Sequence, residues 1–326
     1  MSQMASRWDP NRDFINPHLM RELLAAPAPE AACVRGIIAK ALQHRQSLEP
    51  RETAALLAVT EPQLLEEMFA AAAAVKKAVY DNRIVTFAPL YCANFCVNNC
   101  LYCGFRSGNS QAVRRALSQQ EIIKETEVLC GQIGHKRLIA VFGEHPSYGA
   151  PYIAQTLKSI YSVKVPVKNG WGQIRRVNVN AAPMAVEDLK LIKEAGIGTY
   201  QVFQETYDRQ LYAELHPGGT PKADFLWRLY ALHRAFEAGI DDVAMGALFG
   251  LGDWKFEVLG LLLHARELEQ AFGIGPHTVS FPRLEAACGS ALPQTNYVSD
   301  TDFRKLVAVL RLSIPYAGLI VTARET

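Results

Sequence analysis

The sequence predicts an α/β protein: a parallel (β/α) barrel of the TIM type, preceded by an N-terminal helical extension and truncated after the seventh strand. Three observations lead to this prediction. Residues 14–80 are rich in helix-forming residues, strand-like and helix-like segments alternate from residue 84 onward, and polar residues follow most of the strand-like segments. We therefore expect a helical extension over residues 1–80 and a barrel domain over residues 81–326.

The alternation sets the expected order of the elements. Strands are predicted at 84–90, 137–142, 176–180, 199–204, 242–248, 277–281 and 318–322. Helices are predicted between them at 118–132, 153–163, 186–194, 223–238, 256–272 and 301–312, the first of them opened by the capping box Ser118-Gln-Gln-Glu121. Parallel neighbouring strands need crossover connections of this length, and the helices then cover the sheet.

A doubly wound open sheet is the competing architecture. An open sheet concentrates polar residues at one switch point, whereas a barrel mouth collects them from every strand. Here polar residues follow most of the strands, which favours the barrel: a cysteine-rich loop, Gly143-Glu144, Asn178 and Asn180, Gln204-Glu205, and Arg324-Glu325. The sequence stops after the seventh strand, so we expect either an incomplete barrel or a shortened form of a longer protein.

Charge and hydropathy exclude several classes of function. The 326 residues include 34 basic and 32 acidic ones, for a net charge of +2, and no long basic run occurs. This pattern predicts neither a nucleic-acid partner nor a membrane surface. The N-terminus lacks the apolar core of a secretory signal, and no apolar stretch reaches the roughly 20 residues of a membrane helix. We expect a cytoplasmic protein.

The cysteines point to a metal centre. Seven are present, and the segment 92–103 holds four of them. An odd, clustered set without a secretion signal indicates metal binding over disulfides. Cys96, Cys100 and Cys103 follow a C-x3-C-x2-C spacing. Three thiolates on one loop can hold three irons of a [4Fe–4S] cluster, and the open fourth iron can chelate S-adenosylmethionine, whose reductive cleavage yields a 5′-deoxyadenosyl radical.

A zinc site is the alternative. Structural zinc takes four ligands, which here would have to include Cys92 in an unusual C-x3-C-x3-C-x2-C spacing. We instead interpret Cys92 as a small apolar residue beside the loop. The remaining cysteines, Cys33, Cys130 and Cys288, are expected to be inert buried thiols.

Polar side chains on the later strands supply further candidates. Asn178 and Asn180 share one face of their strand, because side chains alternate with a period of two. A buried amide without a partner costs ~1–3 kcal/mol, so either a ligand or a structural network must satisfy them. Glu205, at the end of the following strand, is a candidate for a ribose or substrate contact.

With an aromatic residue, Tyr102, before the third cysteine, the motif resembles that of the radical SAM superfamily, C-x3-C-x-(aromatic)-C. The resemblance implies that Tyr102 lies against the adenine of S-adenosylmethionine. It also implies that Gly143 and Glu144 bind the amino group of this cofactor, with the carboxylate accepting a charge-assisted hydrogen bond.

Longer segments sharpen the resemblance to the aromatic amino acid lyase branch, and most closely to the HydG family of tyrosine lyases, which mature iron–iron hydrogenases. They are 91–106, 143–146, 175–183, 201–207, 240–243, 246–251, 275–278 and 280–284. The resemblance implies a radical SAM carbon–carbon lyase that cleaves the Cα–Cβ bond of tyrosine to p-cresol and dehydroglycine. The family then forms CO and cyanide at a second cluster held by cysteines of a C-terminal domain, whereas this sequence has only Cys130 and Cys288 beyond Cys103.

The family resemblance suggests two more site residues. His277 matches a histidine that binds an extra iron at the second cluster, and its alternative is a hydrogen-bonded histidine at a strand start. Arg324, at the mouth end of the last strand, is predicted to bind the substrate carboxylate through two hydrogen bonds, with Ser313 and Thr322 as weaker candidates. The catalytic candidates are thus Arg324, Glu205 and His277.

The resemblance also implies partners: L-tyrosine, an electron donor such as ferredoxin or flavodoxin, and other hydrogenase maturation proteins. Two related functions stay open, a tyrosine lyase of thiamine synthesis and a tryptophan lyase, since the barrel motifs overlap. A catalytically silent metal-binding scaffold is the alternative from a different class.

Overall fold

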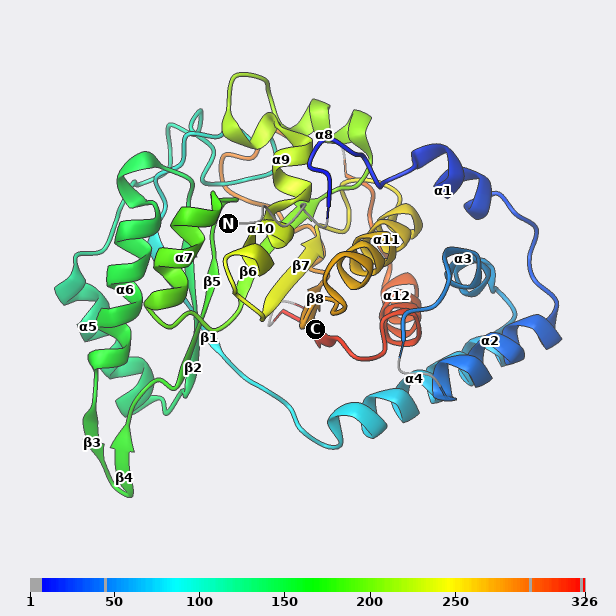
Figure 1. Cartoon of the computed structure of the whole chain (residues 1–326), viewed down its shortest axis with the longest axis horizontal. Coiled ribbons are helices and arrows are strands. Elements are labelled where there is room, and N and C mark those ends of the chain that lie inside the picture. Colours follow the sequence, from blue (N-terminus) through cyan, green and yellow to red (C-terminus); the bar gives the residue numbers. More distant parts are fainter. Residues whose placement is uncertain (1–7, 44–45, 293–294, 323–324, 326) are drawn as a thin grey trace, which may run out of the picture.

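The computed structural model describes residues 8–43, 46–292, 295–322 and 325. Its main feature is a parallel sheet of seven strands in the order β1, β2, β5, β6, β7, β8 and β9 (Figure 1). The strands are β1 (Ala88–Ala93), β2 (Arg137–Phe142), β5 (Arg176–Asn180), β6 (Tyr200–Glu205), β7 (Val243–Ala247), β8 (Thr278–Ser280) and β9 (Gly318–Ile320).

The strand order decides between the two predicted architectures. Each strand pairs in parallel with the next one along the chain, so the sheet has no switch point. Within the described residues, β1 and β9 are the two ends of the sheet and do not pair with each other. The molecule is therefore a curled, open barrel of seven strands, as predicted, and not a doubly wound sheet.

Helices follow the strands and cover the outer face of the sheet. They are α5 (Gln119–Glu127), α6 (Ala150–Ser162), α7 (Val186–Glu194), α8 (Arg209–Leu215), α9 (Phe225–Leu229), α10 (Ala231–Glu237), α11 (Trp254–Phe272) and α12 (Asp300–Ser313). Val177 and Val179 of β5 join one hydrophobic core with Ile153 and Leu157 of α6. Because side chains alternate along a strand, the asparagines of β5 face the opposite, concave side.

In the described part of the N-terminal region, four helices precede the sheet, as the sequence predicts: α1 (Pro17–Leu24), α2 (Ala31–Gln43), α3 (Pro50–Ala58) and α4 (Pro62–Tyr80). Three of them, α1, α3 and α4, begin with proline, whose fixed φ suits the first helical turn. Helix α4 packs along α12, and α3 packs along α11 (Figure 1). The predicted domain boundary near residue 80 coincides with the end of α4 and stays a prediction.

Several predicted elements differ in detail. Strand β1 begins four residues later than predicted, and the apolar residues Ile84 and Val85 are exposed. The helix predicted at 223–238 is a short 3-10 turn, Pro221–Ala223, followed by α9 and α10. Helix α8 and the antiparallel hairpin of β3 (Val165–Val167) and β4 (Gly170–Gly172) were not predicted.

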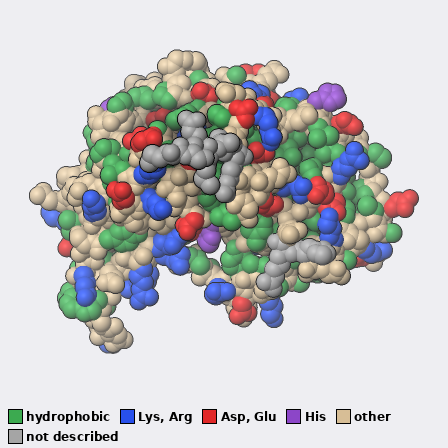
Figure 2. Space-filling model, in the orientation of Figure 1, with side chains coloured by type: hydrophobic (Ala, Val, Ile, Leu, Met, Phe, Trp, Pro, Cys, Tyr) green, Lys and Arg blue, Asp and Glu red, His purple; other side chains and the backbone are tan. Residues whose placement is uncertain are grey.

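The surface carries both signs of charge. On the face drawn in Figure 2, lysine and arginine side chains are interspersed with aspartate and glutamate. None of the described helices combines the length and the apolar character that crossing a membrane requires.

Candidate functional site

The cysteine loop lies at the carboxyl end of the sheet, directly after β1. Segments that follow three other strands hold it through backbone hydrogen bonds. Val97 N donates to Glu144 O at 2.8 Å, Leu101 N donates to Leu215 O at 3.1 Å, and Ala291 N donates to Leu101 O at 2.7 Å. The loop is thus held by the segments that follow β2, β6 and β8, which places the three cysteines over the mouth of the barrel.

The three motif cysteines are shielded to different degrees. Cys100 is buried, and Cys96 and Cys103 are partly exposed. Burial raises the pKa of the Cys100 and Cys103 thiols, while the Lys222 ammonium acts in the opposite direction. Phe105 N donates to Cys103 Sγ at 3.4 Å. A bound metal deprotonates a coordinating thiol outright, so these thiols suit a ligand role in spite of their burial.

Cys92 lies apart from this set. Its side chain is fully buried in the core beneath α5 and α6, and its Sγ donates to Leu90 O at 3.5 Å. Burial raises its pKa to about 12. This agrees with the interpretation of Cys92 as an apolar residue.

In the described part of the chain, no three His, Cys, Asp or Glu side chains are grouped as one metal ion would require. Ligands of a cubane bind different iron atoms and need not meet that condition.

The other cysteines divide. Cys130 is buried, as predicted. Cys33 and Cys288 are exposed, so the prediction of buried thiols was wrong for both. Cys33 is an exposed residue of α2, and Cys288 lies in the loop that follows β8.

Gly143 and Glu144 lie beside the cysteine loop. A Cβ at Gly143 would stand 2.3 Å from the carbonyl oxygen of Phe95, so only glycine permits this close approach. Asn98 Nδ2 donates to Glu144 Oε2 at 2.6 Å. The carboxylate predicted to bind the cofactor amino group is therefore fixed next to the cysteines, with its side chain partly exposed.

Asn98, inside the cysteine motif, links three parts of the site and was not singled out from the sequence. Its Oδ1 accepts a hydrogen bond from Lys222 N at 2.9 Å, and its Nδ2 lies 3.7 Å from Cys96 Sγ. The residue is only 2% exposed. The only feature of the sequence that could have identified Asn98 is its place within the cysteine motif, and this place does not show which residues it bonds to.

Tyr102 is buried against His216, which also went unnoticed in the sequence. His216 Nδ1 lies 2.7 Å from Tyr212 O, and a carbonyl can only accept, so Nδ1 carries the proton. His216 Nε2 then accepts from the Tyr102 hydroxyl at 2.8 Å. Burial lowers the pKa of His216 to about 3, so its ring is neutral. The contact between Tyr102 and adenine stays a prediction.

Glu205 ends β6 in a left-handed conformation, with φ of 72°, at an irregularity in the pairing with β7. Its Oε1 lies 2.7 Å from Lys222 Nζ and 3.4 Å from Arg228 Nη2. Burial alone would raise the pKa of this carboxyl, but the two cations outweigh burial and lower the pKa below its ordinary value. Glu205 is therefore ionised and paired.

The two asparagines of β5 lie on the concave face. Asn178 Oδ1 accepts a hydrogen bond from Thr199 N at 3.1 Å, so a structural network serves this amide in part. Asn180 is partly exposed at the carboxyl end of its strand, closer to the cysteine loop.

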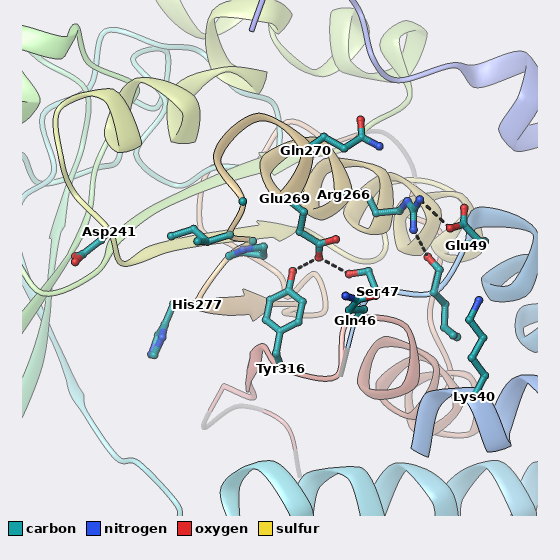
Figure 3. A pocket seen from close by; sticks show the side chains of 15 residues that line it. Lys40, Gln46, Ser47, Glu49, Asp241, Arg266, Glu269, Gln270, His277 and Tyr316 are labelled. Atoms are coloured by element: carbon teal, nitrogen blue, oxygen red, sulfur yellow. Dashed lines mark hydrogen bonds and ion pairs between the residues drawn. The ribbon is translucent and has the colours of Figure 1, made fainter. Parts of the chain in front are cut away.

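His277 lies elsewhere. It precedes β8, so it stands at the amino end of the parallel sheet, opposite the cysteine loop. Its Nδ1 is 4.0 Å from Asp242 Oδ1. Together with Glu269 and Tyr316 it lines a pocket of about 930 Å³, and these side chains are labelled in Figure 3. The structure does not bring His277 together with the cysteines or with Glu205.

Of the three residues predicted to bind the substrate carboxylate, the structure describes Ser313 and Thr322. Arg324 lies outside the described residues. Ser313, at the end of α12, is buried and hydrogen bonded to Thr53 Oγ1 at 2.9 Å, far from the mouth of the barrel. Thr322 follows β9 at the carboxyl end and is partly exposed.

Comparisons with known proteins agree with this fold. Residues 90–261 match the Radical SAM superfamily. The 2-iminoacetate synthase of Escherichia coli (strain K12) is 30% identical over 274 residues, which cover 83% of this chain and 69% of that protein.

Two solved structures of HydG resemble the whole fold. A crystal structure of HydG, a maturase of the [FeFe]-hydrogenase, matches with a TM-score of 0.90 and 47% identity over 96% of this chain and 68% of that chain. HydG from Carboxydothermus hydrogenoformans matches with a TM-score of 0.84 and 42% identity over 95% of this chain and 69% of that chain.

Proposed function

The chain belongs to the radical SAM superfamily, and on that premise we propose that it is a lyase that cleaves the Cα–Cβ bond of L-tyrosine to p-cresol and dehydroglycine in the maturation of [FeFe]-hydrogenase. The observation that carries this proposal is the 47% identity with HydG over 96% of the chain. The three-cysteine loop with Glu144 fixed beside it supports the same function.

The donor set fits a [4Fe–4S] cluster. Cys96, Cys100 and Cys103 would hold three irons, and Cys92 faces the outer core, where it cannot be a fourth ligand. When bound, the cluster and S-adenosylmethionine supply the reductive cleavage that starts radical chemistry. The protein contributes binding, orientation and exclusion of water.

The surrounding residues would bind the cofactor through distinct contacts. The Glu144 carboxylate accepts hydrogen bonds from the ammonium of S-adenosylmethionine, and Gly143 keeps the backbone close to the loop. Tyr102 presents its ring to the adenine, with its hydroxyl held by His216. Glu205 and Asn180 offer oxygen and amide groups to the ribose or to the substrate, and Asn178 adds a second amide on the same face.

Substrate and partner contacts complete the proposal. Arg324 binds the tyrosine carboxylate through two parallel hydrogen bonds. His277, at the other end of the sheet, would bind an iron in a separate site. An electron donor such as ferredoxin or flavodoxin supplies the electron, and the product passes to other hydrogenase maturation proteins in the cytoplasm.

A second candidate is the tyrosine lyase of thiamine synthesis, which the 30% identity with a 2-iminoacetate synthase favours. The compound in that name is the same molecule as dehydroglycine, so both candidates predict one bond cleavage. A tryptophan lyase would act on a different substrate, and a silent scaffold would form no product.

The decisive experiment uses protein that is reconstituted with iron and sulfide under anaerobic conditions and then reduced. With S-adenosylmethionine and tyrosine it should release p-cresol and 5′-deoxyadenosine. Cys100→Ala should abolish both products, whereas the matched control Cys130→Ala should form them normally. 5′-Deoxyadenosine without p-cresol would reject both tyrosine candidates, and the same assay with tryptophan tests the third. Rescue of a strain lacking either its hydrogenase maturase or its thiamine lyase separates the first two.

A further inference from the structure

A buried group of charges lies against the cysteine loop. Lys222 and Arg228 both pair with Glu205, at 2.7 Å and 3.4 Å. The side chains of Lys222, Arg228 and Glu205 are 12%, 8% and 11% exposed. Arg228 Nε also donates to Phe203 O at 2.6 Å, which fixes its guanidinium at the end of β6. We call Lys222, Arg228 and Glu205 the charge cluster.

The charge cluster is not neutral. Two cations and one carboxylate leave one excess positive charge. Among the described residues, no second carboxylate forms a salt bridge with either cation. The neighbouring His216 is neutral, because its pKa is lowered to about 3 by burial. A buried charge without a partner costs several kcal/mol, so this excess calls for an anion close by.

The excess charge faces the cysteines. Lys222 Nζ lies 5.4 Å from the centre of the Tyr102 ring, and Tyr102 immediately precedes Cys103. The backbone N of Lys222 donates to Asn98 Oδ1 at 2.9 Å, so the residue is attached to the loop itself. Lys222 and Arg228 both act electrostatically on Cys100. The region in need of an anion therefore coincides with the place where an iron–sulfur cluster would bind.

We propose that the ammonium group of Lys222 supplies a positive charge that compensates the negative charge of the iron–sulfur cluster and raises the reduction potential of the cluster. A cubane held by three thiolates is a net anion, and reduction adds one more negative charge. A fixed cation nearby therefore stabilises the reduced form more than the oxidised form. This inference rests on the cluster of the proposed function and not on tyrosine as the substrate.

The alternative is that Lys222 only neutralises Glu205 and leaves the cluster unaffected. The two roles predict different shifts of the reduction potential of the cluster, and these shifts can be measured. If the net charge of the group acts on the cluster, removing Lys222 and removing the Glu205 charge must shift the potential in opposite directions. If Lys222 only neutralises Glu205, neither substitution changes the reduction potential of the cluster.

The experiment is a redox titration of the reconstituted protein without S-adenosylmethionine or tyrosine. The reduced cluster is monitored by electron paramagnetic resonance. The variants are Lys222→Met, Lys222→Arg and Glu205→Gln, with Lys190→Met, an exposed lysine of α7, as the matched control. At a fixed potential, Lys222→Met should lower the ratio of reduced to oxidised cluster about tenfold, equivalent to 59 mV for one electron, and Glu205→Gln should raise it. Lys222→Arg and Lys190→Met should match the wild type.

Unchanged potentials in Lys222→Met, or shifts of the same sign in Lys222→Met and Glu205→Gln, would overturn the inference. The iron content of each variant is measured as well, because a variant that binds the cluster weakly gives no usable titration. Loss of iron from Lys222→Met but not from Lys222→Arg supports a need for the charge, whereas loss from both rejects it. Wild-type protein that binds no iron would defeat the proposed function and this inference together. The expected shifts without any p-cresol would defeat the lyase assignment alone.

Discussion

Glu257 provides a sharp test of the electrostatics around the site. Helix α11 places its carboxyl group beneath the turn that follows Glu205, where it is 1% exposed. Thr206 Oγ1 donates to Glu257 Oε1 at 2.5 Å, and Tyr207 N donates to Oε2 at 2.8 Å. Burial raises the pKa of Glu257 to about 8, although both hydrogen bonds act to lower it. The carboxyl group of Glu257 is thus mostly protonated at neutral pH, and it holds the chain just after Glu205.

The raised pKa links stability to pH. The carboxyl titrates near 4.5 when unfolded and near 8 when folded, so the folded state binds more protons between these values. The free energy of unfolding therefore falls as the pH rises through this window. From pH 6 to pH 8 the contribution of this one group is a loss of about 2 kcal/mol.

Glu257→Gln removes the titration and keeps the shape. The amide oxygen can accept from Tyr207 N, and the Thr206 hydroxyl can rotate to accept from the amide nitrogen. The Tm of the variant minus that of the wild type should therefore increase by several degrees between pH 6 and pH 8, measured anaerobically on cluster-loaded protein. Glu194→Gln, at an exposed position of α7, serves as the control. A Tm difference that stays constant or decreases with pH would refute the reasoning.

Three further substitutions test other parts of the site. Asn98→Ala removes the hydrogen-bond donor to Glu144, and a hydrogen bond to a charged group is worth ~1.5–3 kcal/mol. The affinity for S-adenosylmethionine should therefore fall about tenfold or more, while the iron content stays unchanged. Equal affinities of the variant and the wild type in equilibrium dialysis would contradict this. Tyr102→Phe leaves His216 Nε2 without its donor and should cost ~1–3 kcal/mol in a thermal unfolding comparison, and an unaltered Tm would count against the pairing. His277→Ala should leave p-cresol formation unchanged, because this residue lies at the opposite end of the sheet; a large loss of product would show that His277 serves the same site.

The alternation of segments was sufficient to predict the fold because each parallel strand needs its own crossover helix. Boundaries were less accurate where local pattern and burial disagree. Ile84 and Val85 are β-branched residues in an apolar run, yet they are exposed ahead of β1. The helix predicted at 223–238 is interrupted at Tyr230, whose ψ of 12° ends α9. Nothing in its composition marks that break.

The site was predictable where its residues are neighbours in the sequence. The cysteine spacing and Gly143-Glu144 are local patterns, and the structure places them together. Lys222 and His216 were missed because their partners are remote. Lys222 N meets Asn98 across 124 positions, and His216 meets Tyr102 across 114. A lysine or histidine in a polar segment has no signature of its own until the fold supplies its partner.

The parallel sheet also separates two potential centres. Strand β6 has six residues, which at about 3.3 Å per residue span roughly 20 Å between the amino and carboxyl ends of the sheet. Glu205 and the cysteine loop lie at one end, and His277 lies at the other. Transfer of a hydrogen atom requires the reacting atoms to be about 3–3.5 Å apart. A radical formed at the cysteine loop would therefore be too far away to act directly at His277, so a reaction at the His277 end would need a product that travels from one end of the sheet to the other.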